Sequence, residues 1–342
     1  MQMFDEDGGS ILKILMGTAA LFIIIYGLKE SQQIIVPILL ATFFAIILSA
    51  PMKWLEKKRV PSVVALIAVV VLAVVVITIF VNLIGGSLGE FNSKLPYYQE
   101  RAQTLWQQFG AWLNIGNASD EFFKNFDPTK YVGFASTVIC SLTGVLTNSL
   151  LIFFTMLLML METASFEAKF GNADGSSPAV IHEFTTSIRS YLGLKTIVSF
   201  GTGVLVWIMA AAIGVDFPVL WGLLAFLFNF IPNIGSFIAA VPAVLVALIQ
   251  LGGQSATIFA LGYVAINMII GNIVEPKLMG KGMDLSVLVV FLSLMFWGWV
   301  FGPVGMLLSV PLTLALKLAL NLNPNSEKFA RILSSGNPKK SA

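Results

Sequence analysis

Glu275 is the residue whose type and position most directly suggest chemistry, because it closes the longest stretch of the chain without a charged side chain. Asn267, Gly271 and Glu275 are spaced four residues apart, so they would share one face of a helix. A carboxylate at the end of an apolar helix either takes part in binding or ion exchange, or pairs with a base such as Lys277 or Lys281 just beyond it. The spacing leaves both interpretations open.

Two breaks in the apolar stretches offer a second kind of polar group. The first break reads Pro232-Asn233-Ile234-Gly235, with Asn229 before it and Ser236 after it, and the second reads Gly302-Pro303-Val304-Gly305. A Pro/Gly break leaves backbone N–H and C=O groups without helical partners, and a helix that starts after it presents free N–H donors. The amide of Asn229 suits a solute hydroxyl but not a carried proton, because an amide does not titrate. The predicted binding residues for a small polar solute are Asn229, Pro232, Asn233, Gly235, Ser236, Asn267, Asn272, Glu275, Gly302, Pro303 and Gly305.

The composition places these groups in a membrane protein. Hydrophobic residues make up 57% and charged residues 11% of the 342 residues, against about 25% charged in an ordinary soluble domain. With a mean hydropathy of +0.88, a water-soluble globule could not bury so much apolar surface. The composition therefore excludes a cytosolic enzyme, and a formal net charge of only +2 gives no indication of a nucleic-acid partner.

Several apolar runs are long enough to cross a bilayer as helices, which takes about 17–25 residues. The predicted membrane helices cover 11–28, 34–50, 61–84, 135–161, 196–215 and 256–274. The loop 53–59 holds four basic residues and one acid, so the positive-inside rule places this loop and the N-terminus in the cytoplasm. We expect Gly85 and Gly86 to end the third helix, and an external amphipathic segment to follow.

The two broken stretches resemble each other. Each has an apolar arm, a Pro/Gly break, a second apolar arm, and a proline shortly after the break, Pro242 in the first and Pro311 in the second. The arms are roughly 22 Å long as helices, short of the hydrocarbon thickness. With the crossings counted from the basic loop, the first stretch starts and ends outside and the second starts and ends inside. Two inverted re-entrant hairpins, or alternatively two ordinary kinked helix pairs, would fit this pattern.

Motifs for enzymatic chemistry are missing or incomplete. One cysteine, Cys140, and one histidine, His182, exclude an intrachain disulfide and a multi-histidine metal site. The run Gly85–Gly89 matches the G-x-S-x-G pattern of hydrolases, but His182 is predicted on the other side of the membrane. The metalloprotease pattern that starts at His182 fails because Thr186 stands where the second histidine should be. We therefore predict no catalytic residues, no metal and no cofactor.

The chain resembles a known family over nearly its whole length. The run NFIPNIGSFIAAVPAVL at 229–245 and the run 271–320, with its EPK-x-MG and GPVGMLLSVP elements, are similar to the autoinducer-2 exporter family. The resemblance implies a multi-pass protein of the bacterial inner membrane that exports autoinducer-2, a small polyhydroxylated signal. It also implies a homo-oligomer, similar to pentameric members, with an elevator-like movement. Some members of the family are proposed to be sodium/proton antiporters.

Together, these observations predict an all-α polytopic membrane protein with about eight membrane segments, including two inverted re-entrant hairpins, and with both termini in the cytoplasm. We expect the solute between the two breaks. A sodium/proton antiporter is the alternative, and a scaffold without transport activity is a third hypothesis. The predicted divisions are N-terminal membrane helices at 1–84, an external amphipathic segment at 85–134, a membrane helix and a cytoplasmic amphipathic helix at 135–195, a transport core with the two hairpins at 196–321, and a cytoplasmic tail at 322–342.

Overall fold

The structure is a computed structural model, and it describes residues 3–112, 149–170, 177–232, 234–279, 285–321 and 332–334. These residues form helices joined by turns, and the described part contains no strand, as the all-α prediction requires. The chain divides into two compact units. One unit is Ala45–Asp284, and the other combines Met1–Phe44 with Leu285–Ala342. The boundary falls within α2 (Gln32–Lys57).

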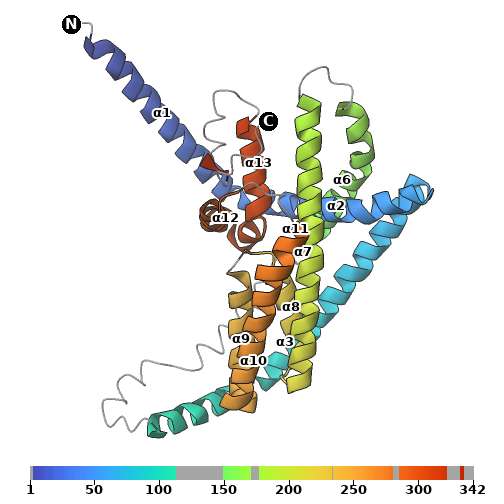
Figure 1. The fold of residues 1–342 in the computed structure, drawn as a ribbon, viewed down its shortest axis with the longest axis vertical. Helices are drawn as coiled ribbons and strands as arrows, with labels where there is room; N and C mark the ends of the chain where they lie inside the picture. Colours follow the sequence, from blue (N-terminus) through green and yellow to red (C-terminus); the bar gives the residue numbers. More distant parts are fainter. Residues whose placement is uncertain are drawn as a thin grey trace. The chain divides into compact units, whose positions relative to one another are not determined.

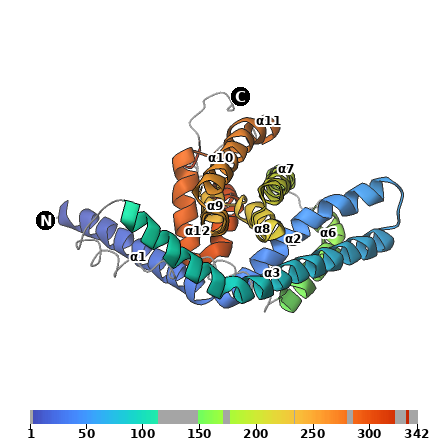
Figure 2. The same ribbon diagram turned by 90° about the horizontal axis from the view of Figure 1, so that it is seen from below.

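The unit Ala45–Asp284 contains most of the helices (Figure 1). They are α3 (Ser62–Trp112), α6 (Ser149–Phe170), α7 (Ser177–Ile213), α8 (Pro218–Phe228), α9 (Gly235–Leu251), α10 (Gly253–Ile269), a π-helix (Ile270–Val274) and α11 (Glu275–Met279). The short helices α8 and α9 lie beside each other, with α7 packed against α8 and α10 against α9 (Figures 1 and 2). Their apolar faces form one core around Trp221, Phe259 and Tyr263.

Two glycines let α7 and α8 approach unusually closely. A Cβ atom at Gly203 would lie 2.7 Å from the carbonyl oxygen of Gly222, and one at Gly222 would lie 2.7 Å from the carbonyl oxygen of Gly203. Small residues at a helix crossing bring the two backbones into van der Waals contact, which is a main source of helix association in membranes. The α8 helix, only 11 residues long, is therefore held firmly against α7.

The helix α3 is longer than the sequence predicts. Gly85 and Gly86 do not end it, because α3 continues for 51 residues to Trp112 and includes Pro96. A glycine within a helix costs only about 1 kcal/mol relative to alanine. Tertiary packing beyond the glycines, where Phe91 and Tyr98 are fully buried, offsets that cost. The predicted external segment therefore begins as an extension of the third helix, here called the α3 arm (residues 89–112).

The second unit contains α1 (Met3–Glu30), the first part of α2, α12 (Val287–Leu307) and α13 (Ser309–Asn321). The helix α1 contacts α12, and the Lys29 ammonium lies 4.1 Å from the centroid of the Trp299 ring. The helices α12 and α13 pack against each other.

Among the residues that the structure describes, five helices are long and apolar enough to cross a membrane, by length and composition. They are Gln32–Lys57, Ser62–Phe91, Thr186–Ile213, Gly253–Leu278 and Val287–Leu307. Four shorter apolar helices accompany them, Ser149–Glu162, Pro218–Phe228, Gly235–Leu251 and Ser309–Asn321. A multi-pass protein fits these lengths, while the expected number of eight membrane segments stays a prediction. The first half of the predicted run 135–161 lies outside the described residues.

Candidate functional site

The first predicted break interrupts the chain between two packed helices. The helix α8 ends at Phe228 and α9 begins at Gly235, so the break falls where the Pro/Gly pattern placed it. Gly235 lies against the backbone carbonyl of Phe228, and a Cβ atom there would collide with it. The Gly235 N–H group donates to the Ile231 carbonyl at 3.3 Å, so this donor of the first turn of α9 is already engaged. Only glycine fits this turn, because the two arms of the hairpin touch there through backbone atoms.

Polar side chains meet at this break and connect it to α7. The buried Asn229 donates through Nδ2 to Ser199 Oγ on α7 at 3.0 Å, and the Ser236 hydroxyl lies 3.4 Å from Asn229 Oδ1. Pro232 is half-buried in the turn, and Asn233 lies outside the described residues. The structure thus brings together two of the predicted residues, Asn229 and Ser236, and adds Ser199.

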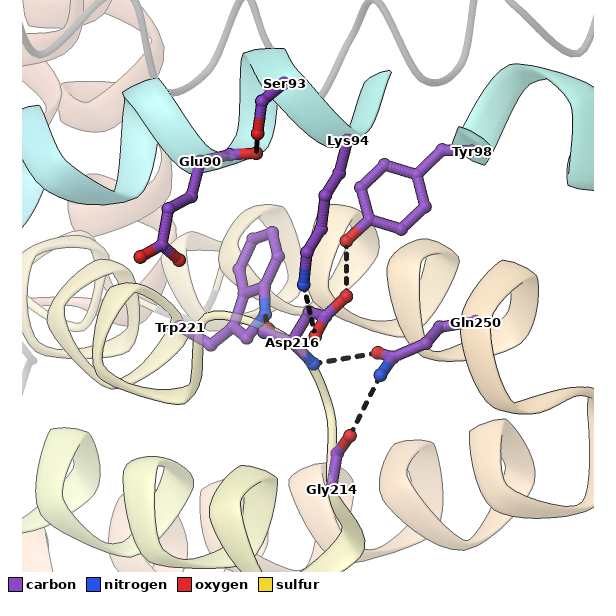
Figure 3. A network of polar contacts seen from close by, with 8 residues as sticks. All are labelled: Glu90, Ser93, Lys94, Tyr98, Gly214, Asp216, Trp221 and Gln250. Atoms are coloured by element: carbon purple, nitrogen blue, oxygen red, sulfur yellow. Dashed lines mark hydrogen bonds and ion pairs between the residues drawn. The ribbon is translucent and has the colours of Figure 1, made fainter. Parts of the chain in front are cut away.

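The two ends of the α8–α9 hairpin meet at a second polar cluster, shown in Figure 3. Gln250, near the end of α9, accepts the Asp216 N–H group at 2.8 Å and donates to the Gly214 carbonyl at 3.1 Å. The Asp216 carbonyl accepts the indole N–H of Trp221 at 2.7 Å. The chain therefore enters and leaves the hairpin at the same place.

The carboxylate of Asp216 also holds the α3 arm. Asp216 accepts the Tyr98 hydroxyl at 2.7 Å and pairs with the Lys94 ammonium at 3.0 Å (Figure 3). Burial raises the pKa of the Tyr98 phenol above its usual value, and the hydrogen bond to Asp216 raises it further. Phe217, the next residue, adopts a left-handed conformation (φ 58°), which is rare for a bulky side chain. Sequence reasoning placed Asp216 only at a helix end, because its partners on α3 are more than a hundred positions away.

Glu275 pairs with a lysine that sequence reasoning missed. Lys195 Nζ on α7 lies 2.6 Å from Glu275 Oε1, and the two side chains are 4% and 21% exposed. The interpretation of Glu275 as half of an ion pair was therefore correct in kind, but the partner is Lys195; Lys281 lies outside the described residues. Both residues lie within apolar helices long enough to span a membrane. A charged pair in such helices is a functional candidate by default.

The helix before Glu275 is not a regular α-helix. Residues Ile270–Val274 form a π-helix, and the Glu275 N–H group bonds to the Ile270 carbonyl five residues back. The expectation that Asn267, Gly271 and Glu275 share one face assumed 3.6 residues per turn, whereas Gly271 lies in a wider π turn, and the shared face stays a prediction. Gly271 and Asn272 are exposed, Asn267 is half-buried, and Glu275 reaches α7.

The second break is built on the same device, within the other unit. Gly302 has φ 65° and ψ −150°, a conformation open essentially to glycine alone, and it interrupts α12 at the predicted position. Gly305 lies against the backbone carbonyl of Trp297, where a Cβ atom would collide, while Pro303 is exposed. The Trp297 indole donates to Thr313 Oγ1 on α13 at 3.1 Å. The last glycine of each break is thus packed against a carbonyl of the arm before it.

A helical membrane protein with two glycine-dependent chain breaks is the class that fold and site define. Residues 14–324 match the model of the AI-2E family transporters, and the chain belongs to this family. A Haemophilus influenzae protein whose name proposes a transport role is 40% identical, over 96% of this chain and 98% of its own. The AI-2 transport protein TqsA of Escherichia coli K12 is 38% identical, over 94% of this chain and 96% of the length of TqsA. YhhT of E. coli K12, also named for a proposed transport role, is 36% identical, over 98% of this chain and 97% of the length of YhhT.

Proposed function

We propose that this protein exports a small polar signalling molecule of the autoinducer-2 class from the bacterial cytoplasm across the inner membrane. The proposal is supported by the family and by the relative whose name states AI-2 transport. It is supported in the molecule by polar groups gathered at a break between apolar helices, where Asn229 is held by Ser199 and faces Ser236. Amide and hydroxyl groups in a low-polarity setting suit a solute rich in hydroxyls.

The joined ends of the α8–α9 hairpin are the observation that carries this proposal. With 11 residues in α8 and 17 in α9, the arms are roughly 16 and 26 Å long, less than about 30 Å of hydrocarbon. Gln250 ties the end of α9 to Asp216 and Gly214 before α8. A hairpin with short arms and a common base enters and leaves a bilayer on one side, with its polar break inside. Backbone groups freed at such a break must face protein or a wet cavity.

The second broken stretch, α12–α13, is the inverted counterpart in this proposal. It enters from the cytoplasmic side, and the proposed solute-binding residues are Asn229, Ser236, Asn267, Asn272, Glu275 and the glycines of both breaks. The protein works by an elevator-like movement within a homo-oligomer such as a pentamer, with both termini in the cytoplasm. The similar packing of Gly235 and Gly305 supports an internal repeat.

Sodium/proton exchange is the second candidate, because one observation favours it. Glu275 is a titratable carboxylate in an apolar helix, next to a π turn of the kind often found at functional sites. Its pairing with Lys195 weakens this candidate, since a cation would have to displace an ammonium already held at 2.6 Å.

Inverted membrane vesicles with and without imposed ion gradients test the proposal. Vesicles that contain the wild-type protein should accumulate autoinducer-2, and Glu275→Gln should retain appreciable uptake with altered affinity. Proteoliposomes with an internal pH dye provide the contrasting measurement. Sodium-dependent proton flux in the wild type that disappears in Glu275→Gln, without autoinducer-2 uptake, would refute export and establish the second candidate.

A further inference from the structure

One face of α7 carries a polar sequence that no binding prediction included. Lys195 and Ser199 are four residues apart, so they lie on the same side of α7, separated by roughly 6 Å along its axis. Lys195 contacts Glu275 after the π-helix, and Ser199 contacts Asn229 at the end of α8. The Lys195–Glu275 ion pair and the Ser199–Asn229 hydrogen bond are therefore neighbours along one helix.

These polar groups are deeply buried among apolar helices. Lys195 is 3% exposed, Ser199 0% and Asn229 8%. Beyond Thr202, whose buried hydroxyl donates to the Val198 carbonyl at 3.0 Å, the same face of α7 is apolar: Val206 and Ala210 are fully buried in the hydrophobic core. Apolar residues thus pack α7 against its neighbours in the core. The buried ion pair beside them costs desolvation free energy even though it is paired, and ionisable residues within apolar helices are functional candidates.

We propose that Lys195 and Ser199 are solute-contacting, specificity-determining residues, and that with Glu275, Asn229 and Ser236 they form one polar strip for a neutral polyhydroxylated solute. This inference rests on the proposed function and adds two residues to its site.

The charge of the strip determines the class of solute. Lys195 and Glu275 neutralise each other, and Ser199, Asn229 and Ser236 are uncharged, so the strip has no net charge. A cation site needs excess negative charge and an anion site excess positive charge, because an ion enters a low-dielectric region only with compensation. Hydroxyl groups, which donate and accept, match a strip of amide, hydroxyl and ion-paired groups.

Thiol labelling tests whether the strip meets water during the transport cycle. In a Cys140→Ser background, Ser199→Cys and Val206→Cys place one thiol each on the same face of α7, at side chains that are both 0% exposed here. Purified protein in nanodiscs is treated with a membrane-impermeant methanethiosulfonate, with and without autoinducer-2. Position 199 should react, position 206 should not, and autoinducer-2 should slow the reaction at 199.

Each outcome has a defined meaning. Equal reaction at both positions, or none at 199, would overturn the strip as a water-accessible surface. Reaction at 199 that autoinducer-2 does not slow, in a protein that transports autoinducer-2, would overturn solute contact there. Reaction at 199 alone, in a protein that does not transport autoinducer-2, would support the strip and refute the proposed substrate instead.

Transport kinetics distinguish solute contact from a purely structural role. Ser199→Ala should raise KM for autoinducer-2 about tenfold, the effect of one lost hydrogen bond. Lys195→Met should lower thermal stability because it leaves the Glu275 carboxylate without its partner. Lys195→Met combined with Glu275→Gln should recover that stability but keep a raised KM. Recovery of both stability and KM in the double variant would show that the pair serves only folding.

Discussion

The hydrogen bond between Tyr98 and Asp216 should contribute more to stability than the ion pair between Lys94 and Asp216. Both contacts fasten the α3 arm to the base of the α8–α9 hairpin (Figure 3). Tyr98 is fully buried, whereas the Lys94 side chain is 44% exposed. A hydrogen bond from a buried hydroxyl to a carboxylate is worth about 1.5–3 kcal/mol. A solvent-exposed ion pair is worth less than about 1 kcal/mol, because water screens it.

Two double-mutant cycles measure these energies separately. Tyr98→Phe and Asp216→Asn form one cycle, and Lys94→Met and Asp216→Asn form the other, each read as the free energy of unfolding in detergent micelles. We expect coupling energies of about 1.5–3 kcal/mol for the tyrosine cycle and less than about 1 kcal/mol for the lysine cycle. Tyr97→Phe, at the exposed neighbouring ring, is the matched control. A lysine coupling equal to or larger than the tyrosine coupling would refute the argument from burial.

Three further predictions follow from other contacts. Gly235→Ala and Gly305→Ala should each abolish solute uptake, because the added Cβ atom forces the two arms of a hairpin apart. Gly201→Ala is the control and should leave uptake intact, because a Cβ atom there meets nothing within 4 Å. Solute uptake is measured in vesicles that contain normal amounts of each variant. The pKa of the Tyr98 phenol is raised above its usual value of 10.0, so the stability that Tyr98 contributes is complete below pH 10 and is lost as the pH rises further. Above pH 10 the free energy of unfolding of Tyr98→Phe should therefore fall less steeply with pH than that of the wild type. Single cysteines at Lys57 and Lys339 should resist an impermeant thiol reagent added to intact cells, while one at Trp106 should react; labelling at 57 would invalidate the inverted topology.

The chain breaks were predictable because their cause is local. Proline and glycine alter the backbone where they stand, so Pro232–Gly235 and Gly302–Gly305 locate the interruptions of both apolar stretches. Gly85 and Gly86 show the limit of the same rule. Packing of Phe91 and Tyr98, residues further along α3, outweighs the weak helix preference of the glycines, and no local pattern contains that information.

The ion pair was not predictable for the opposite reason. Lys195 and Glu275 are 80 positions apart, and only the packing of α11 against α7 brings them together. One signal was available: Lys195 is a lone base next to an apolar run, and Ser199 follows four residues later. The π turn before Glu275 carries no comparable signal, since Ile270–Val274 reads as ordinary apolar helix.

The contact between Gly203 and Gly222 bears on which parts can move. Helices that touch through backbone atoms have no side-chain layer that could rearrange at the crossing, so we expect α7 and α8 to translate together around Gly203 and Gly222. In an elevator-like cycle α7 would then move with α8 and α9 as part of the transport domain, and it would not belong to the stationary scaffold domain. Spin labels on α7 and α8 should keep one distance in every state of the cycle, and the sliding surface must be sought on the outer faces of this group of helices.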